Sequence, residues 1–262
     1  MNLTVHISGI GVLGPGLNDW ATGQSALREP ATWQHANTVV PAPQRLPATE
    51  RRRAGNVVKA SIVVADQALA MSGLDPATLP TVFTSSTGDP LNCHQLCVAL
   101  ALPERLVSPT KFTNSVHNAP AGYWHIAAAS RAPSTSLAAF DASFAAGLQE
   151  AAVQCAATGA PVLLVACDVP YPEPLHTLRP LSDVFALALV LAPAEPGRVL
   201  TFHVSGNDAP TPCAWPGLEA VRSTIPAARA LPLLQALAQD GPACLVLDGH
   251  SSQHLHLSVA AI

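Results

Sequence analysis

The sequence predicts a layered α/β fold, in which helices cover the faces of a sheet. Two observations support this prediction. Short apolar strands alternate with helical segments over residues 1–193, and 49% of the 262 residues are hydrophobic, which suffices to bury a large core. The apolar run at residues 184–192 has the length of a buried strand and is much shorter than the roughly 20 residues of a membrane helix.

The elements follow in chain order from hydrophobic spacing and turn residues. We expect strands at residues 3–7, 81–85, 162–167 and 184–191, and helices at 51–72, 91–100 and 119–129. Gly73 is placed to end the first of these helices. The helix at 119–129 is apolar on all sides and is therefore expected to be buried on all sides. Residues 107–118 are expected to form a loop.

After residue 193 the sequence becomes proline-rich. A modest helical region at residues 227–238 and two strands at 244–247 and 255–259 are expected there. We therefore expect one domain: its main part is residues 1–193, and residues 194–262 form a short C-terminal appendage that completes the same domain.

Charge and composition exclude several classes of protein. A formal charge of −4 and no broad basic face argue against binding to nucleic acid. The only dense basic cluster, Arg51 to Arg53, is expected to be a solvated helix start or a contact for a partner protein. The N-terminus lacks the basic region of a secretion signal, and six scattered cysteines suit a reducing compartment. The sequence therefore predicts a cytoplasmic protein without a membrane contact.

Two motifs are too weak to predict a cofactor or a metal. Gly9, Gly11 and Gly14 match GxGxxG after a strand, but Pro15 and Gly16 interrupt the helix that such a nucleotide site needs, so a glycine-lined turn is favoured. Two histidine-containing clusters lack the paired spacing of structural zinc sites, and we expect no metal there: Cys93, His94 and Cys97, and His250, His254 and His256.

The segment SLAAFDASFAAGLQEA, residues 136–151, has the outline of a catalytic elbow. A strand of small residues turns abruptly into a helix, and such a turn exposes one side chain at a helix N-terminus, where an anion is favoured. Asp141 occupies the turn. Ser143 follows it, but its flanks lack the GxSxG pattern of serine hydrolases.

The segment SPTKFTNSVHNAPAGYW, residues 108–124, is the densest polar stretch that leads into an apolar helix. Asn114, Ser115, His117 and Asn118 could cap that helix, with Pro120 in its first turn. More polar residues are present than one cap requires. The segment is therefore also a candidate for a pocket wall or a subunit contact.

Together these segments resemble the first half of a β-ketoacyl synthase. The resemblance runs from about Leu3 to Ala192 and includes ISGIGVLGPG, SSTGD and the two segments above, of which SPTKFTNSVHNAPAGYW is the most specific. The short synthase-like proteins of aryl-polyene and related pigment pathways are especially similar. The resemblance implies a truncated thiolase-like fold, a layered α/β structure with a mixed central sheet, and makes residues 1–193 the synthase N-terminal-like domain.

The resemblance also implies a lost activity. In the family a cysteine at the elbow attacks an acyl thioester, and matching the segments places Asp141 at that position. The HGT-like histidine segment and the NSFGFGG-like loop of the family's second half are not found. The resemblance therefore implies a chain-length factor, a catalytically inactive subunit that pairs with an active β-ketoacyl synthase, shapes its acyl tunnel and meets the acyl carrier protein only indirectly.

By resemblance, the subunit contact involves the strand before the elbow and the neighbouring polar segment. The expected interface and pocket residues are Phe112, Thr113, Asn114, His117, Asn118, Phe140 and Asp141, and none is expected to be catalytic. Phe140 is expected either to reach toward the partner's tunnel or to fill the core.

Two other functions stay open at this point. One is a stand-alone acyl-thioester hydrolase or decarboxylase that uses Asp141 with His117 or Ser143. The other is a scaffold that contacts carrier proteins through Arg51, Arg52 and Arg53.

Overall fold

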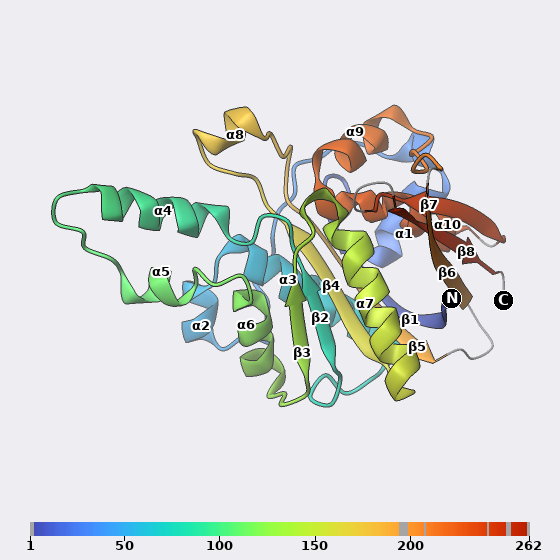
Figure 1. The fold of residues 1–262 in the computed structure, drawn as a ribbon, viewed down its shortest axis with the longest axis horizontal. Coiled ribbons are helices and arrows are strands. Elements are labelled where there is room, and N and C mark those ends of the chain that lie inside the picture. Colours follow the sequence, from blue (N-terminus) through green and yellow to red (C-terminus); the bar gives the residue numbers. More distant parts are fainter. Residues whose placement is uncertain (1–2, 194–198, 207, 240, 250–252, 261–262) are drawn as a thin grey trace.

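A computed structural model describes residues 3–193, 199–206, 208–239, 241–249 and 253–260, with no description of the side chains at 199, 202 and 204–206. These residues form one mixed eight-stranded sheet with the order β3-β2-β4-β5-β1-β6-β8-β7. Helices cover both of its faces (Figure 1). The predicted layered α/β fold with a mixed sheet is therefore confirmed.

The strands confirm most of the predicted ones and add one, β6. β2 pairs in parallel with β3 and β4, whereas the other pairs are antiparallel. Their bounds are β1 Leu3–Leu13, β2 Thr81–Thr84, β3 Ser134–Leu137, β4 Val162–Asp168, β5 Phe185–Pro193, β6 Val199–Gly206, β7 Ala243–Leu247 and β8 Gln253–Val259. β4 is buried throughout, and so are the first seven residues of β5, as two central strands should be.

Two helical layers enclose the sheet. α3 and α6 pack on one face, with Val64 and Trp124 in that core. α1, α7 and α10 pack on the other face, with Leu148 and Leu234 in that core. The α-helices are α1 Trp20–Arg28, α2 Ala48–Arg53, α3 Asn56–Ser72, α4 Pro90–Ala101, α5 Pro109–Thr113, α6 Ala119–Ala128, α7 Ser143–Thr158, α8 Leu175–Leu178, α9 Pro216–Thr224 and α10 Leu231–Ala238. The 3₁₀ turns are η1 Pro30–Thr32, η2 Phe140–Ala142 and η3 Pro226–Ala230.

Gly9 and Gly11 lie inside β1, so the predicted glycine-lined turn is wrong for these two residues. It is present after the strand, where Gly14 and Leu17 exchange backbone hydrogen bonds and Gly16 has a φ of +66°. A Cβ at Gly11 would lie 2.0 Å from the carbonyl oxygen of Val64, and one at Gly9 would lie 2.1 Å from that of Ala68. Both carbonyls belong to α3. The glycines are therefore needed because the backbone of α3 approaches the strand more closely than any side chain allows.

The single helix predicted at residues 51–72 is two helices. α2 ends with Arg51 to Arg53, and α3 begins after Gly55, so the arginines end a short helix rather than begin a long one. A Cβ at Gly55 would lie 2.2 Å from the Asp89 carboxylate. The helix is interrupted here, and the missing side chain of Gly55 lets the Asp89 carboxylate approach the backbone. Gly73 ends α3 in the left-handed conformation, as predicted.

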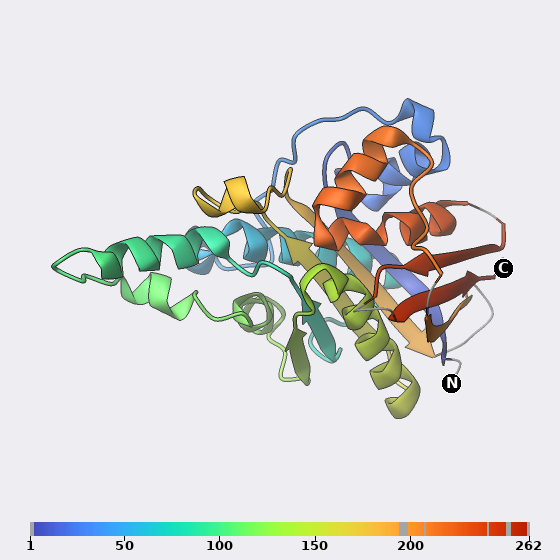
Figure 2. The same cartoon turned by 45° about the horizontal axis from the view of Figure 1, so that its top comes forward.

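The segment from α4 through Asn118 projects from the body and is called the arm below (Figures 1 and 2). The loop predicted at 107–118 contains the short helix α5. α6, predicted to be buried on all sides, is open on the side that carries Gly122 and Ile126. The apolar residues of α6 therefore occupy more of its surface than the neighbouring described elements cover.

The described residues after 198 continue the same sheet. β6 pairs with β1, and β8 and β7 extend the sheet beyond it. α9 is an additional helix that hydrophobic spacing did not predict. The predicted helix at 227–238 is present as η3 followed by α10.

Candidate functional site

The elbow connects β3 to α7 through η2. Phe140 has a φ of +53°, the left-handed region that a sharp turn requires of one residue. The Ser143 hydroxyl closes the turn, since it accepts a hydrogen bond from the Ala139 backbone N–H at 3.0 Å and donates one to the Phe140 carbonyl at 2.6 Å. Ser143 is 1% exposed. Its hydroxyl therefore has a structural role in the elbow.

Asp141 lies in η2, directly before α7, and two arginines hold its carboxylate. Arg179 donates to Oδ1 at 2.6 Å, and Arg229 donates to Oδ2 at 3.0 Å. Arg179 also donates to the Ser86 hydroxyl at 2.9 Å, and its guanidinium lies 3.8 Å from the centre of the Phe140 ring. Each carboxylate oxygen thus has a charged donor. Phe140 is 62% exposed, so it does not fill the core.

Ion pairs continue from Asp141 into the C-terminal part of the chain. Arg229 contacts Asp248 at 3.1 Å, Asp248 contacts Arg222 at 2.7 Å, and Arg222 contacts Glu219 at 2.8 Å. We call this series the charge ladder: Arg179, Asp141, Arg229, Asp248, Arg222 and Glu219. Its three cations and three anions alternate, so each charge lies between or beside opposite ones.

Glu219 forms the far end of the charge ladder. It accepts hydrogen bonds from Arg222 and from the Cys213 backbone N–H. The hydrogen bond from Arg222 is the main reason why the pKa of the Glu219 carboxyl is below its ordinary value. The charge ladder therefore connects the elbow to α9 and to the end of β7.

Asp168, at the end of β4, is a buried carboxylate that organises the same region. Its Oδ1 accepts hydrogen bonds from the Ser85 hydroxyl, the backbone N–H groups of Ser86 and Thr87, and the Thr87 hydroxyl, at 2.7–3.2 Å. Its Oδ2 accepts one from the Ala227 N–H at 2.9 Å. Burial raises the pKa of Asp168, although these hydrogen bonds oppose the rise.

Asp168 thereby positions both cations that hold Asp141. Ser86, whose backbone it binds, contacts Arg179, and Ala227 belongs to the turn η3 that carries Arg229. The sequence analysis did not identify Asp168. The signal was an acidic residue that ends a wholly apolar strand, VLLVACD. Arg179 and Arg229 lie outside regular strands and carry no comparable signal.

The polar segment at 108–124 does not act as the predicted helix cap. Asn118 precedes α6 and makes no side-chain capping bond. Asn114 instead donates to the Arg53 carbonyl at 2.9 Å and accepts from the Tyr123 hydroxyl at 3.0 Å. His117 Nε2 donates to the Ser85 carbonyl at 3.0 Å. These side chains join the arm to the body, and Pro120 lies in the first turn of α6 as predicted.

The predicted site residues fall into four places, and the first is the joint between arm and body that Asn114 forms with Arg53. Phe112 and Thr113 lie on α5, where Phe112 is 68% exposed and Thr113 bonds only to the Pro109 carbonyl of its own helix. His117 and Asn118 line an open cavity of about 540 Å³ with Ser134 and Ser136 of β3. Phe140 and Asp141 meet Arg179 at the elbow. Among the contacts of the described residues, none joins His117 directly to Asp141.

The described residues offer no obvious metal centre. All six cysteines are free, and Cys93, Cys97 and Cys244 are exposed. Across the described ranges, no cluster of three or more histidine, cysteine or acidic side chains is arranged to hold a metal ion. His250, one of the histidines weighed above, lies outside the described residues.

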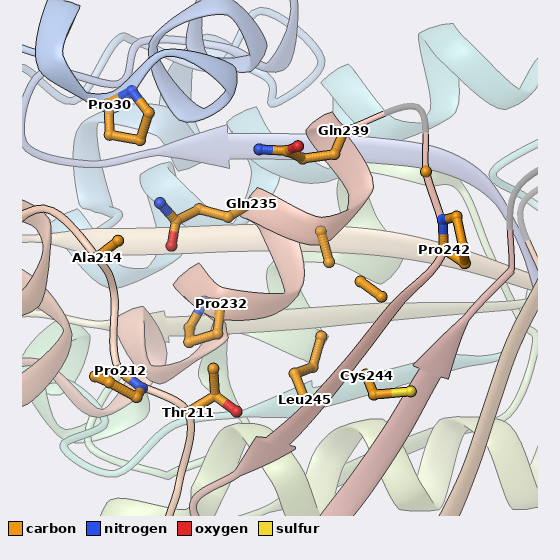
Figure 3. Close-up of a pocket in the computed structure, with 13 residues that line it drawn as sticks. Pro30, Thr211, Pro212, Ala214, Pro232, Gln235, Gln239, Pro242, Cys244 and Leu245 are labelled. Atoms are coloured by element: carbon orange, nitrogen blue, oxygen red, sulfur yellow. The ribbon is translucent and has the colours of Figure 1, made fainter.

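A groove of about 430 Å³ is lined partly by β7, through Ala243, Cys244 and Leu245 (Figure 3). Pro212, Pro232 and Pro242 line it, together with Gln235 and Gln239. None of the predicted site residues lines this groove. The elbow and its charge ladder are therefore the better candidate for the functional site.

Comparison with known proteins agrees on the fold. The family described as "Beta-ketoacyl synthase, N-terminal domain" matches residues 20–252. No curated protein sequence matches the chain. The fold is thiolase-like. Within the described residues, no helix has both the length and the apolar character that a membrane crossing requires.

Three solved structures are similar over nearly their whole chains. A chain of the complex of the ketosynthase ApeO with its chain length factor ApeC, from Xenorhabdus doucetiae, is 23% identical with a TM-score of 0.73, covering 98% of this chain and 99% of that one. A chain of the type II polyketide synthase complex AntDE:AntF is 15% identical with a TM-score of 0.76 and full coverage of both chains. A chain of the ishigamide ketosynthase/chain length factor is 14% identical with a TM-score of 0.72, covering 99% of each chain.

Proposed function

Because the chain belongs to the β-ketoacyl synthase N-terminal domain family, we propose that it is the non-catalytic, chain-length-factor-type subunit of a type II fatty-acid-like or polyene-like synthase. In this role it pairs with an active β-ketoacyl synthase, stabilises it and shapes its acyl tunnel. Similarity to chains of two ketosynthase/chain length factor complexes supports this proposal.

The observation that carries the proposal is the state of Asp141. A synthase needs a nucleophile at the elbow that can accept and release an acyl group. The Asp141 carboxylate is instead bound by Arg179 and Arg229, one on each oxygen. Two charged hydrogen bonds withdraw electron density from those oxygens and fix their position, which suits a structural ion pair better than a nucleophile.

The same contacts weigh against a stand-alone hydrolase or decarboxylase. Ser143 is buried and its hydroxyl already donates to a backbone carbonyl, so it has no base beside it to remove its proton. His117 donates to the Ser85 carbonyl and is not in contact with Asp141 among the described residues. We therefore favour the non-catalytic subunit.

The arm supplies a surface for the partner. α4 is mostly apolar, yet it buries only Pro90, Asn92 and Leu96. Exposed apolar side chains continue through the arm: Leu91, Val98, Leu100, Leu102, Leu106, Phe112 and Val116. Exposed apolar side chains in this number on one segment are typical of a protein interface, because association removes their apolar area from water.

The edge of the sheet offers a second element for the interface. β3 ends the sheet and pairs with β2 alone, so one row of its backbone groups has no strand beside it. Phe140 follows it and is exposed. We propose that β3, Phe140 and the arm together contact the active synthase. The acyl carrier protein, which one similar complex contains with its ketosynthase, would then be met mainly through the partner.

The first experiment uses light scattering on a sizing column to measure the mass in solution of this chain alone and of this chain co-expressed with an active β-ketoacyl synthase from the same genome. We expect a one-to-one complex. Leu106→Asp with Phe112→Asp should abolish it, because two charges would be buried in an apolar contact. Met71→Asp, at an exposed apolar site on α3, is the matched control and should leave the complex intact. If the chain forms no complex with the ketosynthase, the proposal is refuted.

A second experiment tests the stand-alone hydrolase against the non-catalytic subunit. The purified chain is incubated with acyl thioesters, and free thiol is measured for the wild type and for Asp141→Asn. We expect no turnover that depends on Asp141. Turnover that Asp141→Asn or His117→Gln abolishes would instead establish the hydrolase.

A further inference from the structure

A cavity of about 730 Å³ lies between the arm and the body. Its walls include Asp89, which follows β2, and Val169, which follows β4. These two strands are parallel, and ligands of open α/β sheets commonly bind beyond the carboxyl ends of parallel strands. Its volume is within the range of small-molecule sites.

The acidic groups in the wall are largely occupied. Both Asp183 oxygens accept backbone hydrogen bonds at 2.7 Å, one from Thr38 and one from Val184. Asp89 Oδ1 accepts the Asn92 N–H at 3.0 Å and so caps α4. Only the second oxygen of Asp89 lacks such a partner among the described residues.

The basic groups in the wall are more available. Arg53 pairs with Glu50 at 3.2 Å. The side chains of Arg52 and Lys111, in contrast, make no ion pair or hydrogen bond with any described residue, although both line the cavity. They come from α2 and α5, on two different walls. The lining of the cavity therefore includes two solvent-exposed residues whose cations are not paired with any described residue.

Buried asparagines fix the backbone that carries these cations. Asn92 donates to the Lys111 carbonyl at 2.8 Å, and Asn114 donates to the Arg53 carbonyl, next to Arg52, at 2.9 Å. Both asparagines are at most 9% exposed. The two walls are thus held in place before a ligand arrives, which lowers the entropic cost of binding.

We propose that this cavity binds a small phosphate-bearing molecule. A phosphate group has three acceptor oxygens, so it can bind the Arg52 guanidinium and the Lys111 ammonium together, and Gln95 and Asn56 of the wall supply further amide donors. The proposal does not depend on the elbow or on an association with a synthase.

The test measures the melting temperature of the full chain in sodium phosphate and in glycerol 3-phosphate, each against sodium chloride of equal ionic strength. Ligand binding to the folded state raises the melting temperature as the ligand concentration rises. We expect such a rise for the wild type. In Arg52→Gln with Lys111→Gln, the apparent affinity should fall by at least about tenfold, because two charge-assisted contacts are lost.

Two further variants distinguish a built site from general surface charge. Asp89→Asn removes the one partly free acid of the wall and keeps an α4 cap, so it should tighten phosphate binding. Arg131→Gln removes an exposed cation that does not line the cavity and should leave the affinity unchanged. Equal responses to phosphate and chloride, or equal losses in Arg131→Gln and the double variant, would overturn the proposal.

Discussion

At the scale of single residues, Asp141 combines two features that a reactive thiol would use. It precedes the 16-residue helix α7, and two guanidinium groups lie within hydrogen-bond distance of its side chain. Both features stabilise a negative charge. The elbow therefore has electrostatics that would also stabilise a thiolate, although the residue there is a carboxylate.

A cysteine at this position should accordingly be unusually acidic. In Asp141→Cys, the pKa of the new thiol should lie well below the usual value of about 8.5. The measurement is the rate of alkylation by iodoacetamide between pH 5 and 9, followed by mass spectrometry of the peptide. Exposed Cys97 serves as the internal control. Adding Arg179→Gln should raise the pKa again; equal titration of both thiols would contradict the electrostatic account.

The position of Asp141 could be predicted from the sequence, but its partners could not. The small-residue strand and the following helix locate the elbow, whereas Arg179 and Arg229 reach it from segments 38 and 88 residues away. No local pattern encodes such distant contacts. The same limit explains why Asn114 and His117 were expected to cap α6. Their partners in the fold, Arg53 and Ser85, are remote in the chain, so the sequence offered only the neighbouring helix as a partner.

At the scale of elements, hydrophobic spacing predicted the central strands well and their limits less well. β4 and β5 are apolar runs of strand length, and burial on both faces leaves no alternative for them. β1 extends past its predicted end because its glycines continue the strand under α3. The single helix expected at 51–72 is two helices because the backbone is extended at Ala54 and Gly55, a break that helical spacing alone does not reveal.

The contact of β1 with α3 gives a sharp prediction. Gly11→Ala would place a methyl group 2.0 Å from a backbone oxygen of α3, so the two elements must separate. We expect a loss of at least about 3 kcal/mol in the free energy of unfolding, at the upper end of the usual cost of overpacking. Urea denaturation measures it. Gly122→Ala, where a Cβ meets nothing within 4 Å, is the control and should be neutral or stabilising; a similar loss there would contradict the argument.

At the scale of the whole molecule, the charge ladder joins the elbow to the C-terminal part of the sheet. The pKa of Glu219 is lower in the folded protein than its ordinary value of 4.5. The Glu219–Arg222 pair therefore stabilises the fold fully above that value, and its contribution is lost as the pH falls through the lower folded pKa.

Acid unfolding should reveal this contribution. Between pH 6 and pH 3, the unfolding free energy of the wild type should fall more steeply than that of Glu219→Gln, because the variant has no carboxylate to protonate. The difference between the two proteins isolates Glu219 from Asp89 and Asp168, whose raised pKa values act in the opposite sense. Glu104→Gln, at an exposed site on the arm, is the control. Parallel curves for wild type and Glu219→Gln would exclude a role for the pair.

The alternation of charge along the ladder has a consequence for how this sequence can change over generations. Replacing Asp141 by an uncharged residue removes the anion between Arg179 and Arg229, and replacing Arg229 alone deprives both Asp141 and Asp248 of a partner. A single step that removes one of these charges is therefore penalised, and the effects of steps at neighbouring positions are not additive. Positions 141, 179, 229 and 248 should therefore vary together among descendants of this chain, whereas a cysteine at position 141 can be accepted alone because its thiolate keeps a negative charge beside both arginines.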